Sequence, residues 1–144
     1  MAMEGLGKDF NVVHNADNVF VNLRDYAGVT FIGFEDGGDT TFTITTSTAA
    51  SGGTTATADI IDHYYTSNGV GGVWTLRTQT AAETVEPNDD AEQDCVAIHV
   101  SAEMLADGES YVKCARDQAS GVTVAILHGL KTQRNPANLP SPIV

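Results

Sequence analysis

Histidines are the side chains of this sequence best suited to metal binding or proton transfer. The four are His14, His63, His99 and His128. Zinc sites usually show two histidines at a short spacing, such as i and i+4 on a helix. No two histidines here are two or four residues apart. We therefore interpret His63 and His99 as solvent-facing or interface residues of strands, and a β-barrel enzyme that uses these two with a metal remains an alternative.

The acidic segment 86–94, with the sequence EPNDDAEQD, is a second candidate for ion binding. Carboxylate oxygens bind calcium, but an EF-hand loop places its ligands at alternate positions around a central glycine. This segment has neither feature, so we interpret it as a solvated loop. The same interpretation applies to Asp36 and Asp39, which flank a pair of glycines.

Nucleophilic catalysis has no signature in the chain. Cys95 and Cys114 have no base signalled nearby in sequence, and a Gly-x-Ser-x-Gly elbow is absent. The glycine pairs lack the lysine and the following helix of a phosphate-binding loop. We therefore predict a protein without enzymatic activity, catalytic residues, cofactor or metal, and we expect the two cysteines to be reduced thiols.

Aromatic side chains gather in one segment and suggest a different kind of site. Tyr64, Tyr65 and Trp74 fall on two strands joined by a glycine-rich turn. Such rings form platforms for sugars, although packing in a core or at an edge is their commoner use. A carbohydrate-binding or adhesion module that uses these three residues is therefore an alternative function.

Short strands must position all of these residues. Apolar and polar residues alternate with the period of two that is typical of strands, and turn residues separate the segments. No segment predicts a helix of ten residues. The expected fold is all-β, an antiparallel sandwich or small, jelly-roll-like barrel. The main strands are expected at residues 10–13, 19–23, 29–34, 40–46, 60–66, 73–78, 95–100, 111–116 and 122–130.

Two of these predictions have consequences for function. Residues 95–130 hold the most apolar runs and predict a three-stranded meander that forms the base of the fold. Residues 29–34 are apolar on both sides, with Val29 and Phe31 on one and Ile32 and Phe34 on the other. This pattern predicts either full burial or an interface on one side. Residues 47–58 are small and polar, and predict a mobile loop.

The chain divides into three parts. Residues 1–16 are expected to be an N-terminal arm, residues 17–130 a single β domain, and residues 131–144 an extended strap. Prolines at 136, 140 and 142 exclude a central strand or a helix from the strap. Extended termini suit attachment to a neighbour. The residues predicted to contact a partner are Leu6, Phe10, Arg134, Leu139 and Ile143.

The charge balance limits the partners. Only 7 basic residues stand against 19 acidic ones, which gives a net charge of −12. Such a chain is poorly suited to nucleic acid or to an anionic membrane surface, because both are bound through Lys and Arg. No apolar run approaches the about 18 residues of a transmembrane helix, and two cysteines are too few for a disulfide framework. We expect synthesis in a reducing cytoplasm.

A set of motifs from residue 93 to residue 140 carries a family resemblance. The motifs are DCVAI at 94–98, LADG at 105–108, YVKC at 111–114, VAILH at 124–128 and, most distinctively, QRNPANLP at 133–140. In these motifs the sequence resembles a family of small minor capsid or head-decoration proteins of actinobacterial tailed phages. The likeness extends to most of the chain from about residue 18, but the N-terminal arm departs from it.

The resemblance implies a virion structural protein on the capsid surface, made in the host cytoplasm and without enzymatic activity. Its implied partner is the major capsid protein, which it would stabilise or bridge between capsomers. The resemblance also implies a homo-oligomer, such as a trimer, on the shell.

Overall fold

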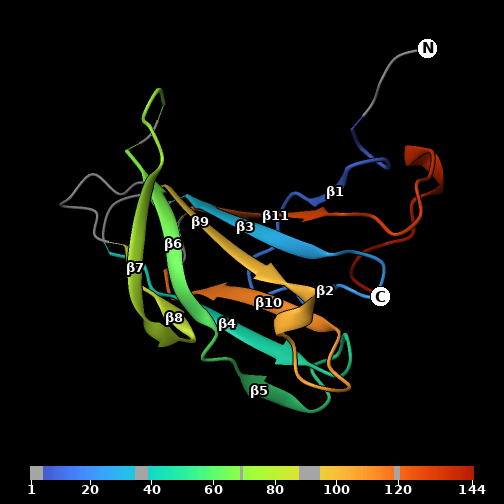
Figure 1. Cartoon of the computed structure of the whole chain (residues 1–144), viewed down its shortest axis with the longest axis horizontal. Coiled ribbons are helices and arrows are strands. Elements are labelled where there is room, and N and C mark those ends of the chain that lie inside the picture. The colour runs from blue at the N-terminus through green and yellow to red at the C-terminus, as the bar shows by residue number, and fades with distance from the viewer. Residues whose placement is uncertain (1–4, 35–38, 69, 88–94, 119–120) are drawn as a thin grey trace.

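A computed structural model describes residues 5–34, 39–68, 70–87, 95–118 and 121–144 (Figure 1). These residues form two antiparallel sheets packed as a sandwich, which confirms the all-β prediction and favours the sandwich over a closed barrel. The elements are β1 (Phe10–Val13), β2 (Val21–Asn22), β3 (Gly28–Phe34), β4 (Phe42–Ser47), β5 (Thr55–Thr57), β6 (Ile61–Ser67), β7 (Thr75–Ala82), β8 (Thr84–Val85), β9 (Cys95–Ser101), η2 (Ala102–Met104), β10 (Tyr111–Arg116), β11 (Val122–His128) and η3 (Pro136–Asn138). Within the described ranges, no helix is long and apolar enough to span a membrane.

The larger sheet has the strand order β1-β11-β3-β9-β6-β7, and the smaller one has the order β2-β10-β4-β5, with β8 also paired to β4. The predicted meander at residues 95–130 is therefore wrong. β9 and β11 both pair with β3, whereas β10 lies in the other sheet between β2 and β4. The apolar runs of β9, β10 and β11 do form the base of the core, but from two facing layers.

The core lies between the sheets. Phe31, Ile98 and Leu127 of the larger sheet are buried and face Phe42 and Ile44 of the smaller one. Gly33 permits the closest approach of the layers, because a Cβ atom at this position would lie 2.5 Å from the ring of Phe42. The inward positions of β3, β9 and β11 alternate with outward ones, as strand geometry requires.

The predicted hairpin and the predicted loop that precedes it have different outcomes in the structure. The hairpin predicted at residues 60–78 is confirmed as the antiparallel pair β6–β7. Residues 47–58 are not only a loop, because Thr55–Thr57 form the exposed edge strand β5 on β4. The residues of this segment are small and polar, and they show no alternation of apolar and polar side chains that would predict a strand. Only backbone pairing with β4 defines β5.

Both termini lie against the body of the domain. Part of the predicted arm is the strand β1, which pairs with β11, and the Asn11 side chain donates a buried hydrogen bond of 2.9 Å to the Tyr26 hydroxyl. The strap leaves β11 and crosses to the smaller sheet. The backbone N–H of Arg134 donates to the carbonyl of Gly7 at 2.8 Å, and that of Asn22 donates to the carbonyl of Pro142 at 2.6 Å.

Candidate interaction surface

The outer face of the larger sheet carries a continuous row of apolar side chains. Strand register places Val124 of β11 beside Ile32 of β3, and Ile32 beside Ala97 of β9. The same row continues through Tyr65 of β6 to Leu76 of β7. Side chains at paired positions point to the same side of a sheet. Five adjacent strands therefore present apolar groups side by side, away from the core.

A second row runs next to the first. It contains Val122 and Phe34, which are paired across β11 and β3, followed by Cys95 of β9. Phe34 is 46% exposed, Leu76 53% and Tyr65 42%. Neither row contains Lys, Arg, Asp or Glu. The two rows together, with Trp74 directly before β7, are called the apolar face below.

The extent of the apolar face can be compared with that of known apolar patches and interfaces. Five strands about 4.8 Å apart and two rows of side chains about 6.8 Å apart enclose roughly 300 Å². This area is at the lower end of the range for the largest apolar patches of monomeric proteins, about 300–600 Å², which are often functional. It is less than half of the roughly 800 Å² that each partner buries in a standard interface.

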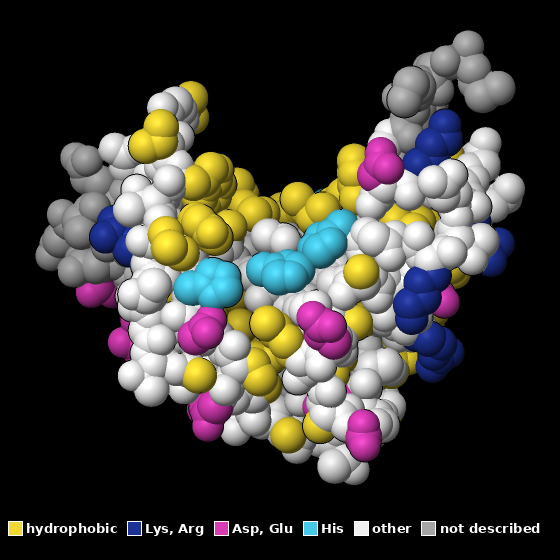
Figure 2. Space-filling view, viewed as in Figure 1, with side chains coloured by type: hydrophobic (Ala, Val, Ile, Leu, Met, Phe, Trp, Pro, Cys, Tyr) yellow, Lys and Arg dark blue, Asp and Glu magenta, His cyan; other side chains and the backbone are white. Residues whose placement is uncertain are grey.

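The surface is hollowed between the β6–β7 hairpin and the N-terminal segment, and hydrophobic side chains line the hollow (Figure 2). Histidine side chains follow one another along its border (Figure 2). Register explains this line. Thr30 of β3 is paired with His99 of β9, and Gly28, two residues earlier on the same side of β3, is paired with His128 of β11. His63 lies on the neighbouring strand β6, which pairs with β9.

Two of the histidines are in direct contact. Nδ1 of His99 lies 3.3 Å from Nε2 of His128, and the ring centres are 5.0 Å apart. Desolvation lowers the pKa of His99, and the neighbouring rings of His128 and His63 lower it further. Both effects favour the neutral form of the His99 imidazole. In the described part of the chain, no three His, Cys, Asp or Glu side chains come together as metal ligands.

His63 takes part in a different contact. Its Nδ1 lies 2.6 Å from Oδ1 of Asp62, and both side chains are largely exposed. The structure thus agrees with the interpretation of His63 and His99 as strand residues on an outer face. The contact between His99 and His128 could not be inferred from the sequence, because these residues are 29 positions apart and their strands are both neighbours of β3.

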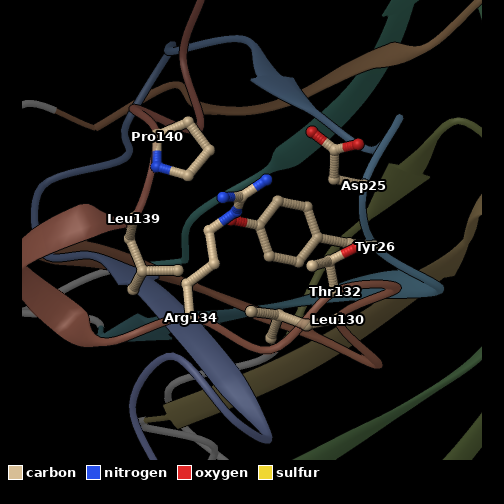
Figure 3. A pocket seen from close by; sticks show the side chains of 7 residues that line it. All are labelled: Asp25, Tyr26, Leu130, Thr132, Arg134, Leu139 and Pro140. Atoms are coloured by element: carbon tan, nitrogen blue, oxygen red, sulfur yellow. The ribbon is translucent and has the colours of Figure 1, made fainter.

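Four of the five residues predicted to contact a partner lie where the two termini meet. Leu6, 37% exposed, precedes Gly7, which is bonded to Arg134. Phe10 begins β1 and is half-buried. Leu139 and Arg134 line one small pocket with Tyr26 (Figure 3). Ile143, 41% exposed, is instead next to the Pro142 carbonyl that binds β2.

The pocket at this junction is too small for an organic ligand. Its volume is about 40 Å³, and it is lined by Asp25, Tyr26, Leu130, Thr132, Arg134, Leu139 and Pro140. Figure 3 shows the Arg134 side chain pointing into it toward Tyr26. Arg134 is exposed as a residue, and Asp25 lines the same pocket. A pocket of this size takes one or two waters.

The aromatic platform that was considered from the sequence is divided by the structure. Tyr65 is on the outer face, opposite Leu76. Tyr64, the residue before it on β6, points to the other side and packs against the core. Trp74 is 49% exposed. Only Tyr65 and Trp74 are therefore available together on the outer side.

The remaining candidates are the two cysteines and the acidic segments. Cys95 and Cys114 are in different sheets and form no disulfide, in agreement with the expectation of reduced thiols. Residues 35–38 and 88–94, which include Asp36 and most of the acidic segment, lie outside the described residues.

The apolar face is the feature that sequence reasoning found only in part. Residues 29–34 are apolar on both sides, a pattern that predicts either full burial or an interface on one side. In the structure, Ile32 and Phe34 are on the outward side of β3. Comparison with known proteins adds no relative. No family model, no curated protein and no solved structure matches this chain.

Proposed function

We propose that this protein is a non-enzymatic structural protein of a virion, which binds the capsid as a decoration or minor capsid protein. The observation that carries the proposal is the apolar face. A chain with a net charge of −12 keeps two adjacent rows of one sheet free of charged residues. Burying these rows against a partner stabilises a complex by about 25 cal/mol per Å² before the costs of association.

The sequence motifs at residues 93–140 suggest which partner this is. Their resemblance to minor capsid and head-decoration proteins of phages favours the major capsid protein, with this chain stabilising or bridging capsomers on the particle surface. A homo-oligomer such as a trimer suits a symmetric shell, because several weak contacts made at once give high avidity. The joined termini lie at the other end of β11, beyond His128, where they would add a second contact.

Mass spectrometry of purified virions tests the proposal directly. The particle to use is the phage whose genome encodes this chain. We expect the protein in the mature head, in a fixed ratio to the major capsid protein. A ratio near one copy per capsomer subunit or per capsomer indicates decoration of the capsid face. Absence of the chain from purified particles would overturn the proposal.

Deletion of residues 133–144 tests whether the strap contributes to capsid binding. Truncation removes Arg134, Leu139 and Ile143, and with them the hydrogen bonds to Gly7 and Asn22. Each such bond contributes about 0.5–1.5 kcal/mol, so we expect a folded domain of reduced stability. In co-sedimentation with capsids we expect binding to be lost. Normal binding by the truncated chain, with β structure verified by circular dichroism, would exclude the strap from the interface.

A carbohydrate-binding or adhesion module is the second candidate, since Tyr65 and Trp74 are both about half exposed on the outer side. Stacking of a sugar ring on these side chains would be lost in Trp74→Ala. A glycan array with the wild type and this variant separates the candidates. Selective glycan binding that requires Trp74 favours the module, whereas an array without signal leaves the capsid as the proposed partner.

A further inference from the structure

We infer that His99 and His128, together with the hydroxyl of Thr30, form a binding site for one divalent transition-metal ion of the zinc class. The inference is independent of the proposed function. The three side chains come from adjacent strands, because β3 lies between β9 and β11 and Thr30 is paired with His99. They project from the outer face of the larger sheet, where an ion from solution reaches them.

The distances between the three side chains match those around a tetrahedral ion. Ligand atoms about 2.0–2.1 Å from zinc are about 3.3–3.4 Å from one another. Nδ1 of His99 and Nε2 of His128 are 3.3 Å apart. Oγ1 of Thr30 lies 3.4 Å from the first nitrogen and 3.5 Å from the second. Three potential ligand atoms thus occupy one face of a coordination tetrahedron.

The separation of the rings agrees with this arrangement. Two imidazoles that direct a ring nitrogen at one ion have their centres about 5 Å apart in tetrahedral geometry. The ring centres of His99 and His128 are 5.0 Å apart, and the rings are stacked, with planes that differ by 23°. The distance between the rings therefore needs little change when two bonds to a metal replace their mutual hydrogen bond.

A glycine creates the space in which the rings meet. A Cβ atom at position 28 would lie 3.0 Å from Cε1 of His99 and 3.2 Å from Cε1 of His128. The same Cβ atom would lie 2.8 Å from the carbonyl oxygen of Val100, so a larger residue would crowd both rings and this backbone group. Gly28 is thus the floor of the site, and Thr30 stands beside it on the same strand.

Ligand type selects the class of ion. Imidazole nitrogen suits zinc, copper and nickel, whereas calcium and magnesium prefer oxygen. Water completes the coordination, so the affinity is that of a two-histidine site rather than of a closed structural zinc site. His63 offers a matched control, because it is on the same face but its Nδ1 already contacts Asp62 at 2.6 Å.

Calorimetric titration of the full chain with ZnCl₂ tests the inference. The protein must be free of a polyhistidine tag, since a tag binds the same ions. We expect one zinc ion per chain in the wild type, with no heat of binding for MgCl₂ at the same concentrations. The inference would be overturned if the wild type bound no zinc, or if MgCl₂ gave the same heat of binding.

Single substitutions then identify the ligands. In His99→Asn and in His128→Asn we expect the affinity for zinc to fall by at least roughly tenfold, because even outer partners of metal ligands contribute that much. His63→Asn and His14→Asn should bind as the wild type does. A variant of His99 or His128 that retains full affinity would overturn the assignment. Thr30→Val, which keeps the shape of the side chain, should show a smaller loss.

Proton NMR supplies a readout that needs no variant. On addition of ZnCl₂ we expect the Hε1 resonances of two imidazoles to shift together and to saturate at one equivalent. The other two imidazoles should not shift. Equal shifts of all four histidines would indicate non-specific binding and would contradict a site at His99 and His128.

Discussion

The two sheets of the sandwich share one core but carry opposite kinds of side chain on their outer faces. On the smaller sheet, register places Lys113 of β10 beside Thr45 of β4, and Thr45 beside Thr57 of β5. The equivalent row of the larger sheet runs from Val124 to Leu76 and is wholly apolar. Threonine favours strand structure, and its hydroxyl forms hydrogen bonds with water. The outer face of the smaller sheet is therefore an ordinary solvated surface.

The difference shows that an apolar outer face is not a requirement of this fold. Both faces are built on the same inward pattern, in which alternate residues such as Phe31 and Ile44 fill the core. If stability were the only demand, threonine would serve on both outer faces equally well. The apolar rows of the larger sheet therefore support the proposed contact with a partner, and the smaller sheet supplies an internal control.

The largest difference expected between inner and outer positions is in stability. Phe31 and Phe34 are on the same strand, but Phe31 is 1% exposed in the core whereas Phe34 is 46% exposed. Phe31→Ala should lower the free energy of unfolding by about 3–5 kcal/mol, because it leaves a cavity. Phe34→Ala should cost about 1 kcal/mol or less. Urea denaturation measures both, and equal losses would contradict the assignment of inner and outer sides.

The next effect concerns binding, and it compares the two outer faces. Leu76→Asp places a carboxylate on the apolar face, whereas Thr45→Asp places one on the threonine face. Both sites accept a charge in the free protein, since Leu76 is 53% exposed and Thr45 is partly exposed. Burying an unpaired carboxylate in an interface is strongly unfavourable. In co-sedimentation with capsids, Leu76→Asp should weaken binding by about 2–5 kcal/mol.

Thr45→Asp is the matched control for this prediction and should bind capsids as the wild type does. A loss that is the same for both variants would point to net charge instead of the apolar face. A loss for Thr45→Asp alone would move the interface to the smaller sheet.

The sequence predicts the fold well where strands are defined by side-chain alternation. The strands at β1, β3, β6 and β10 and the β6–β7 hairpin follow from period two and from turn residues. Their assignment to sheets does not follow. Alternation identifies the two sides of a strand, but it contains no information on which strand is the neighbour. The meander predicted at residues 95–130 fails for this reason.

The histidine contact illustrates the same limit at the level of a site. His99 and His128 come together only because β9 and β11 flank β3 in register, with Gly28 leaving room between them. Nothing in their spacing of 29 residues suggests this. By contrast, the apolar side of β3 was visible in the sequence, because Ile32 and Phe34 alternate with residues that must fill the core.

The smallest expected effect is on thiol reactivity, and it again separates inner from outer positions. Burial raises the pKa of Cys114 to about 12, with Asp17 adding to this and Arg116 opposing it. The raised pKa keeps the thiol protonated, so at pH 8 about one in ten thousand is the reactive thiolate. Cys95, the first residue of β9, is on the outer side and is 7% exposed.

Iodoacetamide at pH 8 should therefore leave Cys114 of the folded protein unmodified, while Cys95 reacts slowly. Peptide mapping by mass spectrometry measures both rates. In urea the two should react equally, because unfolding removes the desolvation that raises the pKa of Cys114. If Cys114 reacted as fast as Cys95 in the folded protein, β10 would not direct this side chain into the core, and the division into inner and outer faces would fail for the smaller sheet.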